Sequence, residues 1–218
     1  MSNRWDTHRA ESFSDGVFAF AITLLVLNIE VRPSEFNHLW RGIANQWPSY
    51  LGFATSFLTV GGIWFVHHGI FRHVRYANRR LMQVNLLLLM AVAFLPFPTS
   101  LVAEAIRNTS AERAAVIFYG ASLLVISLLF SALWGVVASD RSLLKPEVSA
   151  EQVDAIARAT RPALGVYVAA IALAFVVPKV AAFGFLAIAI VAVLRARSDS
   201  PPTPTRLESA EQSPSSPP

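Results

Sequence analysis

Apolar residues along the chain are gathered into six long runs that short polar stretches separate. The runs cover approximately residues 12–31, 48–71, 81–103, 114–138, 160–177 and 179–195. Each is close to the ~20 residues that a helix needs to cross a bilayer. None has the alternation of polar and apolar residues that is typical of barrel strands. The pattern predicts an all-α integral membrane protein with six transmembrane helices per subunit.

Prolines mark two special places in these runs. Pro96 and Pro98 stand near the end of the third run, where they remove backbone donors and predict a kink or an unwound turn near the outer leaflet. Pro178 and Lys179 are almost all that separates the fifth run from the sixth. Because so little chain joins them, the last two runs should form a tight helical hairpin.

The polar stretches predict an orientation and a domain boundary. Six spans place both termini on one side, and that side would carry thirteen of the 18 Lys and Arg residues, so the termini are expected to be cytoplasmic. The segment 32–47 should lie at the outer interface and 139–159 should form an inner amphipathic helix. We expect a membrane domain over 1–198 and a disordered cytoplasmic tail over 199–218, where large apolar residues are scarce.

Composition excludes several classes of protein. Hydrophobic residues make up 54% of the chain and charged residues only 15%, whereas soluble domains carry about 25% charged residues. The chain lacks cysteine, and its net charge of +4 comes from dispersed loop residues, which argues against a nucleic-acid partner. No nucleotide-binding loop, metalloprotease motif, nucleophile elbow or TVGYG potassium filter is present. We expect no enzyme activity and no cofactor.

One carboxylate stands at the mouth of the first run. Asp15 follows Phe13 and Ser14 and directly precedes the apolar residues. Because Glu11 and Asp15 interrupt the entry to this run, a cleaved signal peptide is disfavoured. A carboxylate in a membrane helix is costly unless a partner is nearby. Asp15 therefore indicates a polar cluster between helices.

Candidate partners for Asp15 lie on the next two runs. Trp64, His67 and His68 are spaced i, i+3 and i+4, which places them on one helix face. Asn85 stands one to two turns into the third run. A metal site is a second interpretation, but two histidines without a third ligand disfavour it, and histidines that merely face headgroups and water are a third. Which histidine contacts Asp15 is not readable from the pattern.

The first run also carries an apolar stripe. At about 100° per residue, Phe20, Leu24 and Leu27 fall within about 60° of one another, and Asp15 lies roughly 140° from Phe20. Thr23 is the one hydroxyl beside this stripe. The polar residues can therefore anchor the helix while the stripe faces something else. By periodicity alone, such a stripe is more typical of helix packing or lipid contact than of a pore.

The residues from Arg9 to Leu27 carry the pattern Arg-x-x-x-Phe-Ser-Asp-Gly-Val-Phe-Ala followed by Ile-Thr-Leu-Leu-Val-Leu. This pattern resembles the start of the potassium channels of the transmembrane protein 175 family, in their bacterial branch, which are relatives of the lysosomal and endosomal potassium channels. The resemblance is close over the first run, extends to polar landmarks of the second and third, and is weak beyond residue 105. It implies a homotetramer in the plasma membrane that conducts K⁺ ions.

The resemblance also implies roles for particular residues. The first helices of four subunits would line the pore, with constriction and ion selectivity at Phe20, Thr23, Leu24 and Leu27; the family often has Ile where Phe20 stands. A structural polar network would comprise Arg9, Phe13, Ser14, Asp15, Trp64, His67, His68 and Asn85. Hydrophobic rings would make K⁺ selectivity moderate, because no fixed ligands replace the water that an ion loses.

A different class of function stays open at this point. A proton- or cation-coupled secondary transporter could use Asp15 together with His67 or His68. Such transporters favour helices broken at the bilayer midplane and internal repeats, and neither is evident in the sequence. A structural membrane protein without ion flux is the third possibility.

Overall fold

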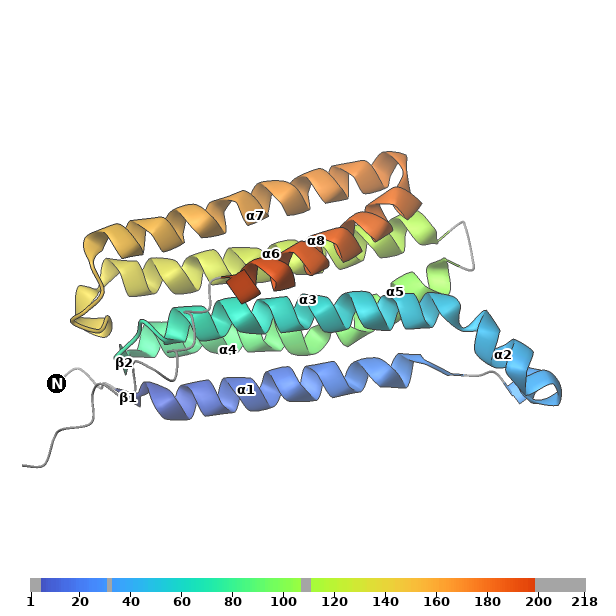
Figure 1. Ribbon diagram of the computed structural model, residues 1–218, viewed down its shortest axis with the longest axis horizontal. Helices are drawn as coiled ribbons and strands as arrows, with labels where there is room; N and C mark the ends of the chain where they lie inside the picture. The colour runs from blue at the N-terminus through green and yellow to red at the C-terminus, as the bar shows by residue number, and fades with distance from the viewer. Residues whose placement is uncertain (1–4, 31–32, 107–110, 199–218) are drawn as a thin grey trace, which may run out of the picture.

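Long helices laid side by side form most of residues 5–30, 33–106 and 111–198, which the computed structural model describes (Figure 1). In chain order the helical elements are α1 (Thr7–Leu24), η1 (Leu25–Asn28), η2 (Pro33–His38), α2 (Leu39–Asn45), α3 (Trp47–Phe71), α4 (Arg79–Phe94), α5 (Pro96–Ala105), α6 (Glu112–Ser139), η3 (Arg141–Leu143), α7 (Ala150–Val176) and α8 (Pro178–Ser198). Two short strands, β1 (Trp5–Asp6) and β2 (Tyr76–Ala77), pair antiparallel. The predicted all-α fold is confirmed in this coarse sense.

Local capping explains where helix α1 begins. It starts at Thr7, ahead of the apolar run, because the side chain of Asp6 accepts a hydrogen bond from the backbone N–H of His8 at 3.0 Å. At its other end the helix tightens into η1, a 3₁₀ turn from Leu25 to Asn28. Helix α1 lies along one edge of the bundle, opposite α7 (Figure 1).

The proline break predicted in the third run is present. Helix α4 ends at Phe94 and α5 begins at Pro96, with Leu95 between them. Proline at the first position of a helix is tolerated because its missing N–H has no helical partner there. The segment before α3 forms η2 and α2, which lie beyond the end of the bundle, and Trp40 on α2 is 86% exposed (Figure 1).

Helix α7 differs from the sequence-based expectation. It begins at Ala150, ten residues before the predicted run at 160, because Ser149 and Gln152 form a capping box that starts the helix early. The helix expected within 139–159 is therefore the first part of α7, and only the short turn η3 precedes it. Helix α8 begins at Pro178, two residues after α7 ends, as expected for the predicted helical hairpin.

Close approach between α6 and the last two helices depends on one glycine. A Cβ atom on Gly120 would lie 2.7 Å from Cγ1 of Ile171 and 2.9 Å from Cζ of Phe185. Real Cβ contacts are not this short, so only glycine fits at this position of α6. Helix α8 also packs against α3, so it lies in contact with α3 as well as with α6 and α7.

One end of the bundle gathers three segments that are distant in the sequence. Strand β1 pairs with β2 in the α3–α4 connection, and the backbone N–H of Arg75 donates to the carbonyl of Leu143 at 2.7 Å. The N–H of Lys145 donates to the carbonyl of His73 at 3.0 Å. The N-terminal segment and two interhelical connections therefore share this end (Figure 1). Which side of a membrane it faces stays a prediction.

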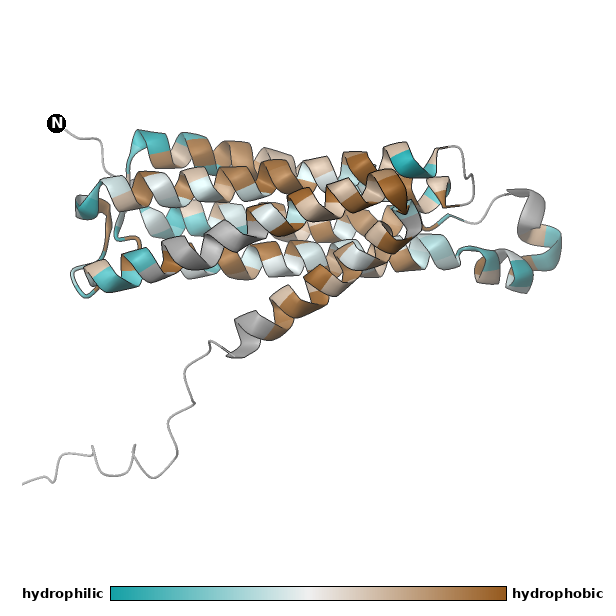
Figure 2. Cartoon of the chain, turned by 90° about the horizontal axis from the view of Figure 1, so that it is seen from above, coloured by the Kyte–Doolittle hydropathy of each residue, from teal (hydrophilic) through white to brown (hydrophobic). Residues whose placement is uncertain are grey.

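Hydrophobic residues predominate along the middle of the bundle, and hydrophilic residues gather toward its ends (Figure 2). Among the described residues, four helical stretches are long and apolar enough to span a bilayer: Thr7–Asn28, Trp47–Phe71, Arg79–Ala105 and Glu112–Ser139. Two shorter apolar stretches, Leu164–Val176 and Val180–Leu194, belong to α7 and α8. The chain is a multi-pass membrane protein. The tail predicted for 199–218 lies outside the described residues, and the division at 198 stays a prediction.

Candidate functional site

A buried chain of hydrogen bonds connects α3, α4 and α1. Nε2 of His67 lies 2.8 Å from Oδ1 of Asn85, Nδ2 of Asn85 donates to Oγ of Ser14 at 3.0 Å, and Ser14 donates to the carbonyl of Ala10 at 2.8 Å. Ser14 and His67 are fully buried and Asn85 is 2% exposed. Three helices are thus held in register by side chains that water does not reach.

The direction of this chain determines the tautomer of His67. Asn85 donates through its amide nitrogen to Ser14, so its oxygen must accept from His67, and Nε2 of His67 must carry a hydrogen. Nδ1 of His67 has no hydrogen-bond partner in the described structure. The ring is stacked on Phe71, with centroids 4.4 Å apart, and is tilted against Phe18 at 5.2 Å. This setting suits a neutral imidazole that acts as a donor.

Asp15 makes its contact beside this chain and not within it. Nε1 of Trp64 donates to Oδ1 of Asp15 at 2.8 Å, and the ring of Trp64 stacks on His68 with centroids 5.7 Å apart. His68 in turn places Nδ1 3.0 Å from a carboxylate oxygen of Glu11. The structure therefore brings Trp64 to Asp15, while His67 bonds to Asn85 and His68 bonds to Glu11.

Arg9 and Phe13 lie away from these contacts. Both are exposed, Phe13 at 58%, and neither takes part in the hydrogen bonds described above. They are four residues apart, so they share a helix face, and that face is turned away from the buried Ser14. Glu11 was missed by sequence reasoning, although its position four residues before Asp15 puts the two carboxylates on one side of α1.

The expected apolar stripe of α1 is exposed in the single chain, with one difference. Phe20 is 63% exposed and Leu27 is 71% exposed, and Thr23 is also exposed. Leu24, in contrast, is partly buried. The opposite face of α1 is buried, with Phe18, Ala21 and Leu25 at 0–1% exposure. Helix α1 thus has one apolar face at the surface of the single chain.

The hydroxyl of Thr23 is oriented by its own helix. Its Oγ1 donates to the carbonyl of Phe20 at 2.8 Å, so its only hydrogen is used within α1. The lone pairs of that oxygen remain available on the exposed face, where Phe20 and Leu27 flank it. The exposed face of α1 therefore carries one oxygen acceptor among apolar side chains.

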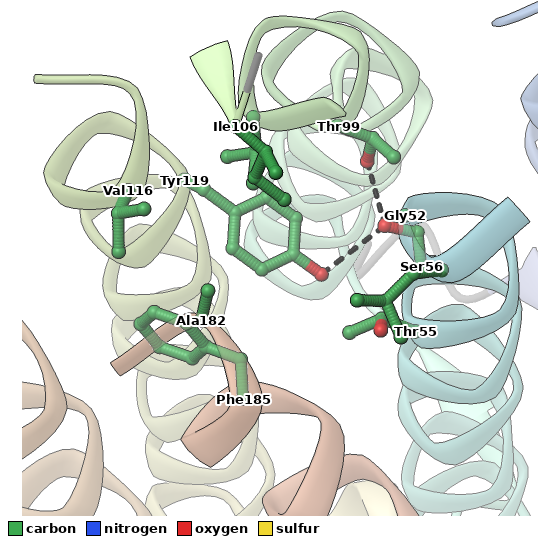
Figure 3. Close-up of a pocket in the computed structure, with 11 residues that line it drawn as sticks. Gly52, Thr55, Ser56, Thr99, Ile106, Val116, Tyr119, Ala182 and Phe185 are labelled. Carbon is green, nitrogen blue, oxygen red and sulfur yellow. Dashed lines mark hydrogen bonds between the residues drawn. The ribbon is translucent and has the colours of Figure 1, made fainter. Parts of the chain in front are cut away.

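A second set of polar contacts holds the other end of the bundle and was missed by sequence reasoning. Asn28, in η1, donates through Nδ2 to the carbonyl of Pro96 at 3.1 Å. Three buried hydroxyls nearby form a chain from Tyr119 through Ser56 to Thr99, with oxygen separations of 3.2 Å and 2.6 Å (Figure 3). The signal in the sequence was Asn28 itself, an amide within an apolar run.

The cavity beside these hydroxyls is small. Its volume is about 30 Å³, and α3, α5, α6 and α8 contribute its lining (Figure 3). A water needs about 10–15 Å³ on this scale, so the cavity has room for a few waters, whereas ligand pockets measure about 300–1,000 Å³. This cavity is therefore too small to be a substrate site. Among the described residues, no cluster of three or more His, Asp or Glu side chains could hold a metal ion.

The geometry defines the class first: a multi-pass helical membrane protein whose first helix has a buried polar anchor and an exposed apolar face. The family model described as "Endosomal/lysosomal potassium channel TMEM175" matches residues 9–96. A potassium channel of Streptomyces collinus is 42% identical over 157 residues, which cover 72% of this chain and 74% of that protein. A potassium channel of Chamaesiphon minutus is 42% identical over 174 residues, covering 78% and 85%.

A solved structure agrees with these sequence matches. The crystal structure of a lysosomal potassium-selective channel TMEM175 homolog from Chamaesiphon minutus aligns with a TM-score of 0.78 and 40% identity, covering 87% of this chain and 97% of that one. The chain therefore belongs to the TMEM175 family, and the resemblance drawn from Arg9 to Leu27 is confirmed. The family is one of ion channels, which is not a class of enzyme.

Proposed function

We propose that this protein is a potassium-permeable ion channel of the plasma membrane that conducts K⁺ passively through a pore lined by α1. The observation that carries the proposal is the two-sided character of α1. One face is buried and bonded to α3 and α4 through Ser14 and Asn85, while Phe20 and Leu27 on the other face are more than half exposed. Membership of the TMEM175 family and the names of the bacterial relatives support the same function.

The pore requires more than one subunit, and we propose a homotetramer. A single copy of α1 at the edge of the bundle cannot enclose a path, and closed rotational symmetry brings the same helix of each copy to one axis (Figure 1). We propose six membrane helices per subunit, because the last two helices are also long enough to cross a bilayer. Helix α7 has 27 residues and α8 has 21, so both are long enough to cross at about 1.5 Å per residue.

Ion passage in this proposal depends on hydrophobic rings. Phe20, Leu24 and Leu27 from each subunit form the constriction, and Thr23 adds a ring of oxygen acceptors between them. An ion must give up part of its water to pass a narrow apolar ring, and K⁺ is less strongly hydrated than Na⁺. The ring therefore favours K⁺ moderately, and it can close the path when it dewets.

Coupled transport is the competing function, and it is less well supported. It would require protonation changes at Asp15, His67 or His68 to control access to a substrate site. His67 is fully buried and held by Asn85, and the cavity of about 30 Å³ is too small for an organic substrate. Membership of a channel family also disfavours the transporter.

Tracer flux in liposomes distinguishes these functions. Purified protein is reconstituted into vesicles that are loaded with KCl, and uptake of rubidium tracer is followed without any imposed proton or sodium gradient. A channel accumulates the tracer under these conditions, whereas a coupled carrier does so only when a proton or sodium gradient is imposed. Vesicles without protein set the background. Absence of uptake under every gradient contradicts both functions and leaves a structural membrane protein.

A further inference from the structure

The C-terminal end of α1 with η1, away from the buried chain at Ser14, is bonded to α5 by a side-chain hydrogen bond. Nδ2 of Asn28 donates to the carbonyl of Pro96 at 3.1 Å, across 68 positions of the sequence. Asn28 is the last residue of η1, and Pro96 is the first residue of α5, directly after the break at Leu95. The bond therefore joins the end of α1 to the place where the third membrane run is interrupted.

The geometry of η1 connects this bond to the exposed apolar face. In a 3₁₀ turn, side chains at i and i+3 lie in line, whereas in an α-helix they are offset by about 60°. The change from α1 to η1 at Leu25 thus brings Leu27 closer to the line of Leu24. Leu25 points into the core at 0% exposure, and Leu27 points outward at 71%. Asn28, the next residue, makes the hydrogen bond to Pro96 that holds η1 against α5.

Further hydrogen bonds anchor the acceptor side of the bond. Thr99, in the first turn of α5, donates its hydroxyl hydrogen to the carbonyl of Leu95 at 2.8 Å. Because that hydrogen is used, Ser56 must donate to Thr99 at 2.6 Å, and Tyr119 must donate to Ser56 at 3.2 Å. The three hydroxyl side chains are at most 4% exposed and come from α5, α3 and α6 (Figure 3). The turn that offers the Pro96 carbonyl is therefore fastened to two further helices.

We propose that Asn28 is a positioning residue for the Leu27 ring of the pore, and that its hydrogen bond to Pro96 fixes the height and rotation of η1. This inference rests on the proposed function, in which α1 lines the pore. Asn28 does not contact the permeating ion. It acts through Leu27, because a shift of η1 moves four copies of Leu27 at once in a symmetric tetramer.

The first test removes the donor without changing the size of the side chain. Asn28→Asp keeps the shape of Asn but offers no N–H to the Pro96 carbonyl. We expect the ratio of open to closed time in planar bilayer recordings to change about fivefold, the shift that loss of one hydrogen bond produces. The preference for K⁺ over Na⁺, measured from the reversal potential, should fall because the ring is less fixed. Asn28→Ala removes the donor without adding charge and replaces Asn28→Asp if that variant does not assemble.

Ser100→Ala is the matched control in the same turn of α5. Ser100 is partly exposed, and its hydroxyl donates within α5 to the carbonyl of Phe97 at 2.7 Å. Its removal should leave open time and reversal potential unchanged. If Ser100→Ala alters both as strongly as Asn28→Asp, any disturbance of α5 suffices, and the specific role of Asn28 is overturned.

Thiol accessibility gives a second measurement that does not depend on current recordings. The chain has no cysteine, so Leu27→Cys introduces a single thiol in each subunit. The rate of its modification by a small charged methanethiosulfonate reagent reports where residue 27 lies relative to the water-filled path. We expect Asn28→Ala in this background to change that rate about fivefold, on the same hydrogen-bond argument, and Ser100→Ala to leave it unchanged. An equal rate in all three proteins overturns the inference.

Failure of the inference can be told apart from failure of the proposed function. If Leu27→Ala alters conductance but the Asn28 variants match the wild type in both measurements, α1 lines the pore and Asn28 does not position it. If Leu24→Ala and Leu27→Ala are both without effect on conductance and reversal potential, α1 does not line the path. The inference then falls together with the pore assignment.

Discussion

Ser14 and Asp15 are adjacent in the chain, yet their side chains join different contacts. Ser14 is fully buried and accepts from Asn85, whereas Asp15 is partly exposed and accepts from Trp64. Successive residues of a helix point about 100° apart, so one short motif can bond to two neighbouring helices. This explains how α1 is fastened to both α4 and α3 while its other face stays free.

The buried chain gives a stability prediction for Asn85. Asn85→Leu leaves the Nε2–H of His67 without an acceptor and removes the donor to Ser14, in a place that water does not reach. An unsatisfied buried polar group costs about 1–3 kcal/mol. At about 2–4 °C per kcal/mol for a protein of this length, the apparent Tm in detergent should fall by several degrees.

The control for Asn85 is the partly exposed pair of Glu11 on α1 and His68 on α3. Glu11→Gln weakens the contact with His68, whose side chain is 43% exposed, and exposed ion pairs contribute only about 0–1 kcal/mol. Its Tm should therefore stay close to that of the wild type. If both variants lower the Tm equally, burial does not distinguish the two contacts and the assignment of His67 as a buried donor is wrong.

At the scale of whole elements, sequence reasoning found the helices better than their contacts. The runs of apolar residues located α3 and α6 to within two residues at each end, because composition alone decides what can lie in a bilayer. It missed the starts of α1 and α7, since those turns are polar and are stabilised by caps at Asp6 and Ser149. Caps act locally, so an apolar pattern cannot reveal them.

Side-chain partners were only partly predictable. Spacing placed Trp64, His67 and His68 on one face of α3, but the rotation of α3 about its own axis decides which of them meets Asp15. The bond from Asn28 could not be read from the sequence, because its acceptor is a backbone carbonyl and no residue type marks that position. The partial burial of Leu24 likewise depends on how α1 leans against α3.

The packing of α6 against α7 and α8 gives a prediction about Gly120. In Gly120→Ala, the added methyl group would meet Ile171 at 2.7 Å and Phe185 at 2.9 Å, so the helices must separate. Overpacking of this kind costs about 1–3 kcal/mol, and the Tm in detergent should fall by several degrees. Gly135→Ala on the same helix is the control, because no atom lies within 4 Å of the added Cβ. Equal behaviour of the two variants contradicts the close approach.

The two faces of α1 give separable effects on stability and on conduction. In the proposed tetramer, Leu27→Ala should raise conductance and lower the preference for K⁺ over Na⁺, because the side chain is 71% exposed and shortening it would widen the proposed ring at four positions together. Leu24→Ala should act in the same direction and also cost some stability, since Leu24 is partly buried. Bilayer recordings and the Tm in detergent measure the two effects.

Leu25 is the matched control for the pore residues, because it is the same residue type on the buried face. Its exposure is 0%, so Leu25→Ala should cost about 2–5 kcal/mol of stability and leave the conductance of assembled channels unchanged. Val26 does not serve this purpose, since it is 50% exposed. Unchanged conductance and reversal potential in both Leu24→Ala and Leu27→Ala would place the ion path elsewhere.

At the scale of the whole molecule, the charges of the loops and the fold agree on one arrangement. The strand pair of β1 and β2 and the bonds from Arg75 and Lys145 collect the N-terminal segment and two connections at one end of the bundle. Exposed basic residues are numerous there: Arg72, Arg75, Arg79, Arg80, Arg141 and Lys145. Cytoplasmic loops carry an excess of Lys and Arg, so this end should face the cytoplasm.

Topology reporters test that orientation together with the number of spans. A fluorescent protein fused after residue 218 should be bright, and alkaline phosphatase fused there should be inactive, because six spans return the chain to the side of its N-terminus. A phosphatase fusion truncated after α5 should instead be active, since three spans place that point outside. The predicted topology would place thirteen of the 18 basic residues on the inner side, and this excess is the reason for the expectation. An active phosphatase at residue 218 would overturn either the orientation or the count of six. The fusion after α5 then separates the two cases. Activity at both points means that the N-terminus is cytoplasmic and that the total number of spans is odd, so the count of six is wrong. Activity only at residue 218 means that the whole bundle is inverted.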